Sequence, residues 1–460
     1  MEHLDKILGC STGFPNTYVS LPRTTPSVVS LMTGRLPYEH GIRTMFPSSA
    51  ERQLKRDSLP ILLAENGYKT AVVSDYAGEM FHDVALGFDI VKAPSFNFPA
   101  IFRQRSLESQ YLLLVWLNNA LGRRLLPELV LLPQNANPEV LTDQALEMIS
   151  SLPQPFFTTV FYSATHFPYT ANYPDYSYFS NKSYRGAFRF SAPYVLDAKH
   201  LPGPEEQAQV SALYDGALLG VDRALGRLVD NFRQSGLLNN TIIVVTGDHG
   251  ENLYEQGSGL GHGDHFVAGL QSLRTPTVVS VPGCQEKGLV QKDVRSIDLP
   301  RTIAGLLGYS EDADQRFGGR SFYAEDPVPR PVYAETGLWM SSVSTSPIAQ
   351  QRIDYPDILQ TAEIDFEFGD EVVLKQKYQN LVNISKHRLY KEGPWVLLYK
   401  PTRSGVRYEL YDYGNDPHLT RDLSQDNTER TDRMRTRLLA LMAAEPGVAI
   451  KNDFVVYENL

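Results

Sequence analysis

The chain has 460 residues, of which 42% are hydrophobic and 21% are charged, a composition typical of a globular protein with one large core or two unequal ones. It carries 43 Lys and Arg against 53 Asp and Glu, a formal net charge of −10, which argues against nucleic acid as the main partner because phosphate binding needs a basic surface. The chain has two cysteines, Cys10 and Cys284, which are too few for a framework of several disulfides. One disulfide between them is possible, so the cysteine count does not identify the cellular compartment. The longest apolar run, Tyr111 to Leu117, is far shorter than the roughly 18 residues of a membrane-spanning helix.

The first 310 residues alternate helix and strand signals. A helix is predicted to end near Glu65, followed by a buried strand over Thr70 to Val73. A second apolar strand enters at Pro155 and ends near Ala164. Residues 204–235 repeat apolar positions at helical spacing, and an all-apolar strand follows over Thr241 to Thr246. Apolar strands between amphipathic helices predict an α/β fold with a mostly parallel central sheet and helices on both faces.

From about residue 370 the alternation of helix and strand signals gives way to a different pattern. Two short antiparallel strands are predicted around Arg403 to Gly405, with a last helix over Asp432 to Glu445 packing across them. We therefore predict a catalytic α/β domain over residues 1–345 and a small C-terminal α+β subdomain over residues 346–460.

Residues 96–133, rich in Phe, Leu and Arg, fit no strand of the predicted sheet. One hypothesis is a helical insertion buried against the core. The other is an amphipathic lid or membrane-surface helix that admits a lipid-like substrate.

Ligands of open α/β sheets bind beyond the carboxyl ends of the strands, and polar clusters fall at such ends in this chain. One of them pairs Asp248 with His249 on a turn between Gly247 and Gly250. A carboxylate beside an imidazole suits Zn²⁺ or Mn²⁺, and the glycines let the backbone leave strand geometry so that both side chains can reach one ion. The alternative is an ordinary turn closed by the aspartate side chain.

Three histidines are further candidates. His262 and His265 lie in a glycine-rich loop, where they would hold an anionic oxygen or a second metal, or else be solvated loop residues. His166 follows a predicted strand, where it would either serve the site or make structural hydrogen bonds.

Thr24 and Thr25 precede a predicted helix, in the stretch RTTPSVVSLMTGR. A threonine there would meet the positive end of the helix dipole, which favours an anionic group, and a bound metal could activate it as a nucleophile. The same residues fit a helix N-cap with Pro26 at the first helical position. These residues alone do not decide between the two.

The order of the motifs resembles that of the sulfatase family within the alkaline phosphatase superfamily. TTPSVVSLMTGRLPYEHGIR is similar to the family's nucleophile segment, which usually reads C-x-P-S-R, four residues and then T-G-R. LPILLAENGYKTAVV, THFPY, NNTIIVVTGDHGE and SIDLPRTIAGLLG follow in family order, and YELYDYGNDPHLTRDLSQ looks like the family's C-terminal subdomain. The resemblance implies an alkaline phosphatase-like fold and a divalent metal, with Zn²⁺ or Mn²⁺ favoured and Ca²⁺ or Mg²⁺ left open.

The resemblance also assigns roles by position. Thr24 falls where sulfatases have the cysteine that becomes formylglycine, and Asp248 and His249 fall on metal-ligand positions, with Thr24 as a further ligand. His166 and His262 fall on positions that hold the transferred group. Arg35 would brace the nucleophile helix.

Three departures from the family pattern narrow the function. Thr24 cannot mature to formylglycine, Val28 replaces the arginine of C-x-P-S-R, and Ser74-Asp75 stands where Gly-Lys is usual. A threonine nucleophile is more similar to the superfamily's phosphoethanolamine and glycerophosphate transferases. The favoured function is therefore phosphoryl transfer or hydrolysis through Thr24 on a phosphate ester, lipid-linked in one version of the hypothesis, with sulfate esters less favoured.

Sulfatases open with a strand that ends in acidic metal ligands, whereas MEHLDKILGC looks like the part that follows it. We expect that strand to lie upstream of Met1. An upstream leader would make the protein periplasmic or membrane-associated, and its absence would make it cytoplasmic. The alternative is a degenerate, non-catalytic protein that binds anions and has lost those carboxylates.

Overall fold

A computed structural model describes most of the chain. Outside the described residues lie both cysteines, Cys10 and Cys284. The described residues are 3, 11–54, 56–95, 97–108, 116, 120–126, 129, 132, 136–169, 171–192, 202–283, 288–325, 330–339, 352–354, 356–367 and 369–457.

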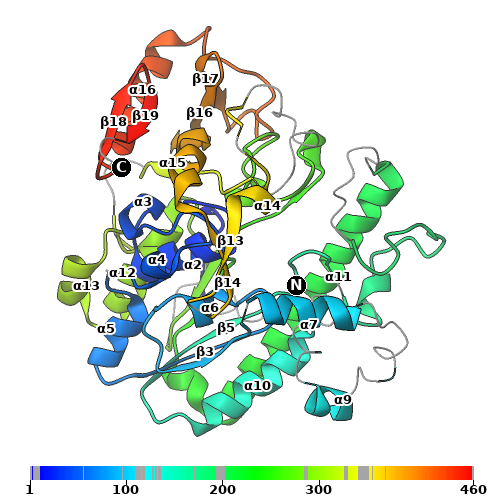
Figure 1. Ribbon diagram of the computed structural model, residues 1–460. Helices are drawn as coiled ribbons and strands as arrows, with labels where there is room; N and C mark the ends of the chain where they lie inside the picture. The colour runs from blue at the N-terminus through cyan, green and yellow to red at the C-terminus, as the bar shows by residue number, and fades with distance from the viewer. Residues whose placement is uncertain are drawn as a thin grey trace.

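A parallel sheet lies on one side of the catalytic region, with strand order β4-β3-β5. The strands are β4 (Ile90–Lys92), β3 (Lys69–Ser74) and β5 (Phe156–Phe161), and β3 is parallel to both neighbours. The strands predicted near residues 70–73 and 155–164 are thus confirmed. Alternate side chains of β3 face opposite ways, as the pleat requires. Val72 packs in an apolar cluster with α2 (Thr24–Thr33), whereas Ala71 and Val73 pack against α10 (Pro138–Ser151). Helices therefore cover both faces of this sheet (Figure 1).

The second sheet differs from the prediction of one mostly parallel central sheet. Its order is β10-β1-β9-β6, formed by β10 (Gly288–Leu289), β1 (Thr12–Phe14), β9 (Thr277–Ser280) and β6 (Ile243–Val245). β9 runs antiparallel to both β1 and β6, and β1 is parallel to β10 alone. The reason is the connection from β6 to β9, which contains no α-helix and so makes no parallel crossover.

The long helix α11 (Pro204–Gln234) joins the two sheets. Its apolar stripe, including Leu225, Leu228 and Phe232, packs in one cluster with residues of α10, β5 and β6. Gly236, at φ +76°, follows the helix, as predicted. All residues of β5 and β6 are only half-buried, and within the described residues each of these strands pairs along one edge.

The remaining elements of the first 325 residues are short. Two small sheets pair β2 with β11 and β7 with β8. The bounds are α3 (Pro37–His40), α4 (Ser49–Arg52), α5 (Leu59–Glu65), α6 (Met80–Asp83), α12 (Leu299–Leu306), α13 (Ser310–Arg316), β2 (Thr17–Tyr18), β11 (Val294–Arg295), β7 (Asn252–Leu253) and β8 (Leu260–Gly261).

An antiparallel sheet of order β12-β15-β16-β17 forms the core of the C-terminal region. The strands are β12 (Val332–Glu335), β15 (Arg388–Glu392), β16 (Trp395–Thr402) and β17 (Gly405–Asp412). β16 and β17 make the predicted hairpin around residues 403–405. The last helix is α16 (Thr428–Ala443), which buries Met434, Leu438 and Met442 against the sheet. β12 lies before residue 346, the boundary expected from the sequence, yet belongs to this sheet.

Smaller elements complete the C-terminal region, whose strands β16 and β17 and helix α16 lie at the top of Figure 1, with β13 (Ala362–Asp365) and β14 (Glu371–Leu374) near its middle. The others are α14 (Ile358–Thr361), α15 (Gln376–Ser385), β18 (Val448–Lys451) and β19 (Phe454–Tyr457). β13 pairs with β14, and β18 pairs with β19.

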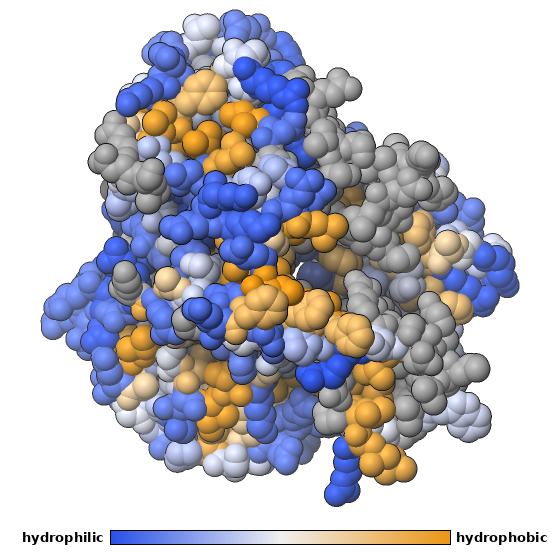
Figure 2. All heavy atoms as spheres, in the orientation of Figure 1, coloured by the Kyte–Doolittle hydropathy of each residue, from blue (hydrophilic) through white to orange (hydrophobic). Residues whose placement is uncertain are grey.

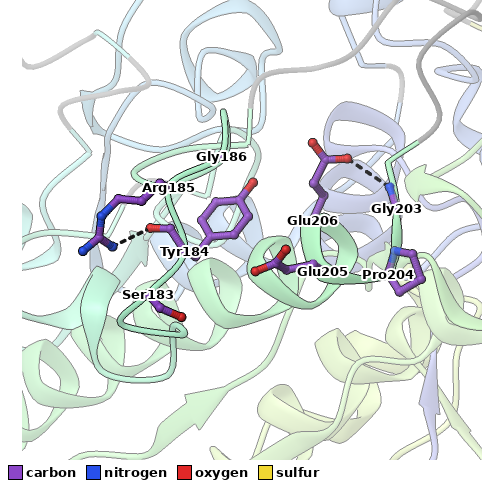
Figure 3. A pocket seen from close by; sticks show the side chains of 8 residues that line it. All are labelled: Ser183, Tyr184, Arg185, Gly186, Gly203, Pro204, Glu205 and Glu206. Atoms are coloured by element: carbon purple, nitrogen blue, oxygen red, sulfur yellow. Dashed lines mark hydrogen bonds between the residues drawn. The ribbon is translucent and has the colours of Figure 1, made fainter.

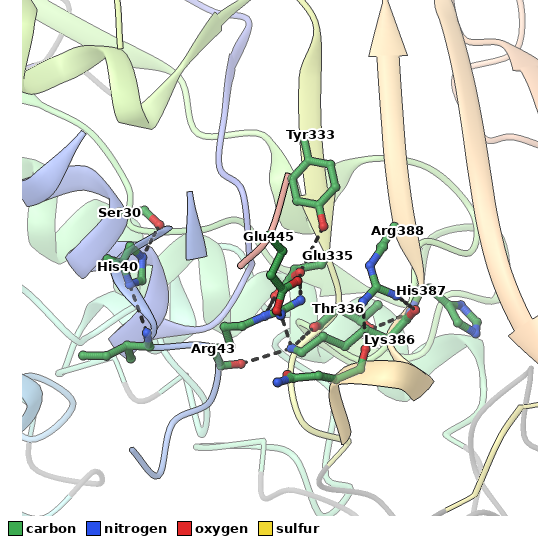
Figure 4. A network of polar contacts seen from close by, with 12 residues as sticks. Ser30, His40, Arg43, Tyr333, Glu335, Thr336, Lys386, His387, Arg388 and Glu445 are labelled. Carbon is green, nitrogen blue, oxygen red and sulfur yellow. Dashed lines mark hydrogen bonds and ion pairs between the residues drawn. The ribbon is translucent and has the colours of Figure 1, made fainter. Parts of the chain in front are cut away.

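A buried cluster of charges ties the segment after α3 to the C-terminal sheet (Figure 4). Arg43 donates two hydrogen bonds to the carboxylate of Glu335 on β12, with Nε–Oε1 2.9 Å and Nη2–Oε2 2.6 Å. Lys386 Nζ lies 3.6 Å from Glu335 Oε1 and donates to the Arg43 carbonyl at 3.0 Å. Arg43 also bonds to Glu445, after α16. Each of these charges therefore has a partner of opposite sign.

The insertion at residues 96–133 is helical where the structure describes it, with α7 (Phe98–Glu108) and α9 (Ala120–Leu125). The described apolar side chains of this insertion divide between the two hypotheses: Leu129 and Leu132 are buried, whereas Phe102 is 66% exposed, Trp116 79%, and Leu121 and Leu125 67% each. None of the helices in the described part of the chain combines the length and the apolar character needed to cross a bilayer.

Candidate functional site

The nucleophile segment forms α2, which begins at Thr24 itself. The N-cap is Arg23, in extended conformation, and its side chain makes no capping hydrogen bond. The predicted N-cap with Pro26 at the first helical position is therefore wrong, because Thr24 and Thr25 already have helical geometry. Backbone N–H groups of a helix's first turn have no partner within the helix, so this end of α2 favours an anionic group.

The turn after β6 carries Asp248 and His249 and is anchored to α2, since Ser27 Oγ donates to the Asp248 carbonyl. Gly250 allows the turn to pack closely on the chain ahead of β9. Its N–H donates to the Ser272 carbonyl at 2.9 Å, and a Cβ at this position would lie 1.9 Å from the Gln271 carbonyl oxygen. The backbone thus leaves strand geometry where the sequence predicted it.

Three donor atoms from these two segments lie together. His249 Nε2 is 3.4 Å from Thr24 Oγ1 and 3.3 Å from Asp248 Oδ2, and that carboxylate oxygen is buried and accepts no hydrogen bond. A hydroxyl, an imidazole nitrogen and an orphaned carboxylate oxygen form a donor set that suits a divalent cation. Within the described residues no group of three or more His, Cys, Asp or Glu side chains is arranged to hold a metal ion, so this set amounts to part of a coordination shell.

His166 and His262 lie beside this set. The ring centroids of His249 and His262 are 3.9 Å apart, and those of His166 and His262 are 5.6 Å apart. Burial lowers the pKa of His166 to about 4 and that of His262 well below its usual range. A neutral ring has one N–H donor and one nitrogen lone pair, so the contact made by one ring nitrogen decides whether the other can donate or accept.

In His262 and His166, a contact made by Nδ1 fixes the orientation of the ring. His262 Nδ1 lies 3.0 and 3.2 Å from the two carboxyl oxygens of Glu251, and His166 Nδ1 lies 2.8 Å from the Phe167 carbonyl oxygen. Burial raises the pKa of Glu251 to about 8, although Tyr169 and Arg23 act in the opposite direction. The Phe167 carbonyl can only accept, so the neutral His166 ring donates from Nδ1 and keeps a lone pair on Nε2. A protonated Glu251 can donate to His262 Nδ1, which leaves the N–H of that ring on Nε2. In both rings Nε2 is left for a ligand.

His265 is separate from the cluster. Its Nδ1 accepts the Val267 N–H at 3.2 Å, and burial lowers its pKa, although Asp264 and a backbone hydrogen bond with Ser258 act in the opposite direction.

The family follows from a comparison of the sequence. The profile of the family described as Sulfatase matches residues 1–309, more than half of the chain. The chain belongs to the sulfatase family. N-acetylgalactosamine-6-sulfatase of Homo sapiens is 24% identical over 349 residues, which cover 69% of this chain and 59% of that enzyme. N-sulphoglucosamine sulphohydrolase of Homo sapiens is 22% identical over 466 residues, which cover 92% of this chain and 81% of that enzyme.

Solved structures give the fold. The phosphonate monoester hydrolase of Agrobacterium radiobacter matches with a TM-score of 0.64 at 16% identity, covering 100% of this chain and 95% of that one. The phosphonate monoester hydrolase from Silicibacter pomeroyi matches with a TM-score of 0.62 at 17% identity, covering 99% of this chain and 94% of that one. This sulfatase-family chain thus has an α/β alkaline phosphatase-like fold.

The positions that depart from the sulfatase pattern have structural roles here. Val28 is 3% exposed in the apolar cluster between α2 and β3. Asp75 accepts the Ser163 N–H at 2.9 Å, which ties the end of β3 to the end of β5. Arg35 donates to the Arg316 carbonyl at 2.8 Å and so braces the end of α2.

Two cavities differ in their relation to this site. One of about 110 Å³ is lined by Thr25 together with Arg52, Glu79 and Asp83. The other, of about 490 Å³, lies between the loop over residues 183–186 and the start of α11, and shares no residue with the histidine cluster (Figure 3). The first cavity is lined by the sequence neighbour of Thr24 but, like the second, by none of Thr24, Asp248 and the three histidines of the cluster.

Sequence reasoning missed Glu251, which contacts His262, together with Tyr169 and Arg23, which both act on the pKa of Glu251. Glu251 follows the DHG motif directly, and a carboxylate two residues after a proposed metal ligand is a usable signal. Arg23 precedes Thr24 in the sequence, but its contact with Asp264, like the position of Tyr169, comes only from the fold.

Alanine at Gly250 is expected to lower kcat/KM by at least about tenfold, because the turn must shift and misplaces Asp248 and His249. Gly288→Ala is a matched control, since a Cβ there meets nothing within 4 Å. Steady-state kinetics and thermal midpoints of both variants check this. An unchanged kcat/KM for Gly250→Ala would mean that the turn does not position the site.

Proposed function

We propose that this sulfatase-family chain is a metal-dependent phosphoryl hydrolase or transferase whose nucleophile is Thr24. The observation that carries the proposal is the placement of Thr24 Oγ1, at the start of a helix and 3.4 Å from His249 Nε2, within the cluster of Asp248, His262 and His166. A hydroxyl in that position can attack an ester that the same cluster holds.

The reaction would proceed in two displacements. Thr24 Oγ forms a bond to phosphorus while the bond from phosphorus to the ester oxygen breaks, and the alcohol leaves with a proton. Water or an acceptor alcohol then displaces Thr24 from phosphorus. The N–H of His262 and those of the first turn of α2 would donate to the non-bridging oxygens as charge develops there, and Nε2 of the neutral His166 would accept from a protonated one.

Sulfatases generally use a divalent metal such as Ca²⁺, and Zn²⁺ or Mn²⁺ would also suit the mixed donors here. Thr24, Asp248 and His249 would hold it. When bound, it would favour the alkoxide of Thr24 at neutral pH.

Phosphate is favoured over sulfate because of the nucleophile. Formylglycine chemistry is unavailable to a threonine, and Val28 and Asp75 supply no cation. The named sulfatase relatives support sulfated sugars as the competing substrate class, whereas the phosphonate monoester hydrolases of the same fold support a phosphorus centre.

A second candidate is the degenerate anion-binding protein. It is favoured by the incomplete set of metal ligands within the described residues.

The substrate in our proposal is lipid-linked, because α7 and α9 expose apolar side chains next to arginines. Figure 2 shows apolar atoms over α9 at the lower right, and Phe102, Trp116, Leu121 and Leu125 are each at least 66% exposed. Exposed apolar side chains beside arginines can insert into a membrane surface while the arginines meet its headgroups.

The test is a panel of nitrophenyl phosphate, nitrophenyl phosphodiester and nitrophenyl sulfate, assayed with Mn²⁺, Zn²⁺ or Ca²⁺, and a vesicle-borne phosphodiester lipid. We expect kcat/KM for a phosphate ester to exceed that for the sulfate by at least about tenfold, with an acid-stable phosphoryl group trapped on the peptide that contains Thr24. A preference for sulfate would overturn the phosphoryl proposal. No turnover together with no metal binding would support the degenerate protein.

The variant Leu121→Asp tests whether the substrate is lipid-linked. It should slow turnover of the vesicle-borne substrate and leave turnover of the soluble phosphodiester unchanged. Equal rates on vesicles for this variant and the wild type would remove the lipid surface from the proposal.

A further inference from the structure

We propose that Arg23 binds a non-bridging oxygen of the ester group at Thr24 and is the cation that this chain uses in place of those missing at Val28 and Asp75. The inference rests on the proposed function, because it concerns the group held at the same site. It assigns a binding role to a residue that the family motif does not include.

Arg23 lies directly beside the nucleophile in the sequence and is held inside the protein. Its residue is 8% exposed, and its extended backbone caps α2. Nη2 donates to the Asp264 carboxylate and lies 3.4 Å from the Leu338 carbonyl oxygen. Nε is buried and makes no hydrogen bond. A buried N–H of a charged group without a partner is costly, so a ligand oxygen at this position would relieve the cost.

Two glycines make room for this side chain. A Cβ on Gly263 would lie 2.5 Å from Arg23 Nε, and a Cβ on Gly337 would lie 2.6 Å from Arg23 Cγ. The two glycines are themselves joined, since the Gly337 N–H donates to the Gly263 carbonyl at 2.7 Å. Gly263 sits between His262 and Asp264, so the loop that supplies the histidine also supplies the space and the counter-ion for Arg23.

The charge of Arg23 reaches the site. It lowers the pKa of His166, His262 and Glu251, each of which is shifted mainly by burial. A guanidinium so placed adds positive potential where the ester oxygens would lie, and its planar fork can bind a tetrahedral anion.

Arg35 and Arg52 differ from Arg23 in their surroundings. Arg35 Nε is also buried without a hydrogen bond, but this side chain donates to the Arg316 carbonyl at the far end of α2, and Arg52 pairs with Glu371. Only Arg23, of these three, acts on the pKa of both His166 and His262. Arg23 is therefore the arginine that the geometry favours for substrate.

The test measures binding of orthophosphate and of sulfate by calorimetry, together with kcat and KM, for the metal-loaded chain. Arg23→Gln should weaken orthophosphate binding and raise KM about 10- to 100-fold, Arg23→Lys should keep part of the affinity, and guanidinium ion should partly restore Arg23→Ala. Arg35→Gln, which removes a bracing arginine, should leave anion affinity unchanged.

Gly337→Ala provides a second variant, because it displaces the Arg23 side chain without removing its charge. It should reduce orthophosphate affinity in the same direction as Arg23→Gln. Unchanged anion affinity and KM in folded Arg23→Gln, with only the thermal midpoint lowered, would show a structural role and overturn the inference. If Arg23→Gln loses sulfate binding and the wild type hydrolyses only sulfate esters, the phosphoryl proposal fails while the role of Arg23 stands.

Discussion

Thr24→Ala is expected to lower kcat/KM by about 10⁴- to 10⁶-fold, the loss typical of an enzyme whose nucleophile is removed. The side chain lost is a single hydroxyl whose Oγ1 lies 3.4 Å from His249 Nε2, and the adjacent donors stay in place. Substrate binding should therefore change far less than turnover. Thr24→Ser keeps the hydroxyl and should retain measurable turnover and a trapped phosphoryl serine.

Thr25→Ala is the matched control, because Thr25 is the same residue type one position further along α2 and lines the small cavity beside Glu79 instead. Its kcat/KM should stay within about tenfold of the wild type. Wild-type turnover by Thr24→Ala would remove Thr24 from the mechanism, and an inactive Thr25→Ala in that case would transfer the role to Thr25.

The sequence predicted those parts of the fold that depend on local pattern. β3, β5, β6, α11 and the β16-β17 hairpin all have strong periodicity or apolar runs bounded by glycine or proline, and all were confirmed. The short strands β1 and β10, and the antiparallel direction of β9, carry no such signal because they depend on pairing between distant segments.

The residues of the candidate site likewise fall into two groups, those with a local sequence signal and those placed only by the tertiary fold. Asp248, His249, His166 and His262 stand at strand ends or in a glycine-rich loop, and the structure brings them together with Thr24. Their roles remain predictions. The contacts of Arg23 with Asp264 and of Glu251 with His262 depend on how a loop folds back, so the sequence could at most have pointed to Glu251, through its place after the DHG motif.

The second large effect concerns stability. Glu335→Gln is expected to lower the free energy of unfolding by about 3–5 kcal/mol, because Lys386 would be left buried without its anion and Arg43 would keep only Glu445. Both Glu335 and Lys386 are fully buried, so water cannot replace the lost charge. Denaturant unfolding at pH 7 measures the difference. Glu392→Gln is the control: Glu392 pairs with Arg437, whose side chain is 47% exposed, and a pair that exposed contributes at most about 1 kcal/mol.

The pH dependence of the difference in unfolding free energy between wild type and Glu335→Gln distinguishes an effect of the Glu335 charge from an effect of side-chain packing. Burial alone would raise the pKa of Glu335, but Arg43 and Lys386 outweigh it and lower the pKa from 4.5 to about 2. A carboxyl group with a depressed pKa stabilises the folded state above its unfolded value, and this contribution is lost as pH falls through the folded one. The gap between wild type and Glu335→Gln should therefore be full above pH 4.5 and shrink as pH falls toward 2. A gap that stayed constant over this range would mean that packing of the side chain, rather than its charge, holds the C-terminal sheet to the segment after α3.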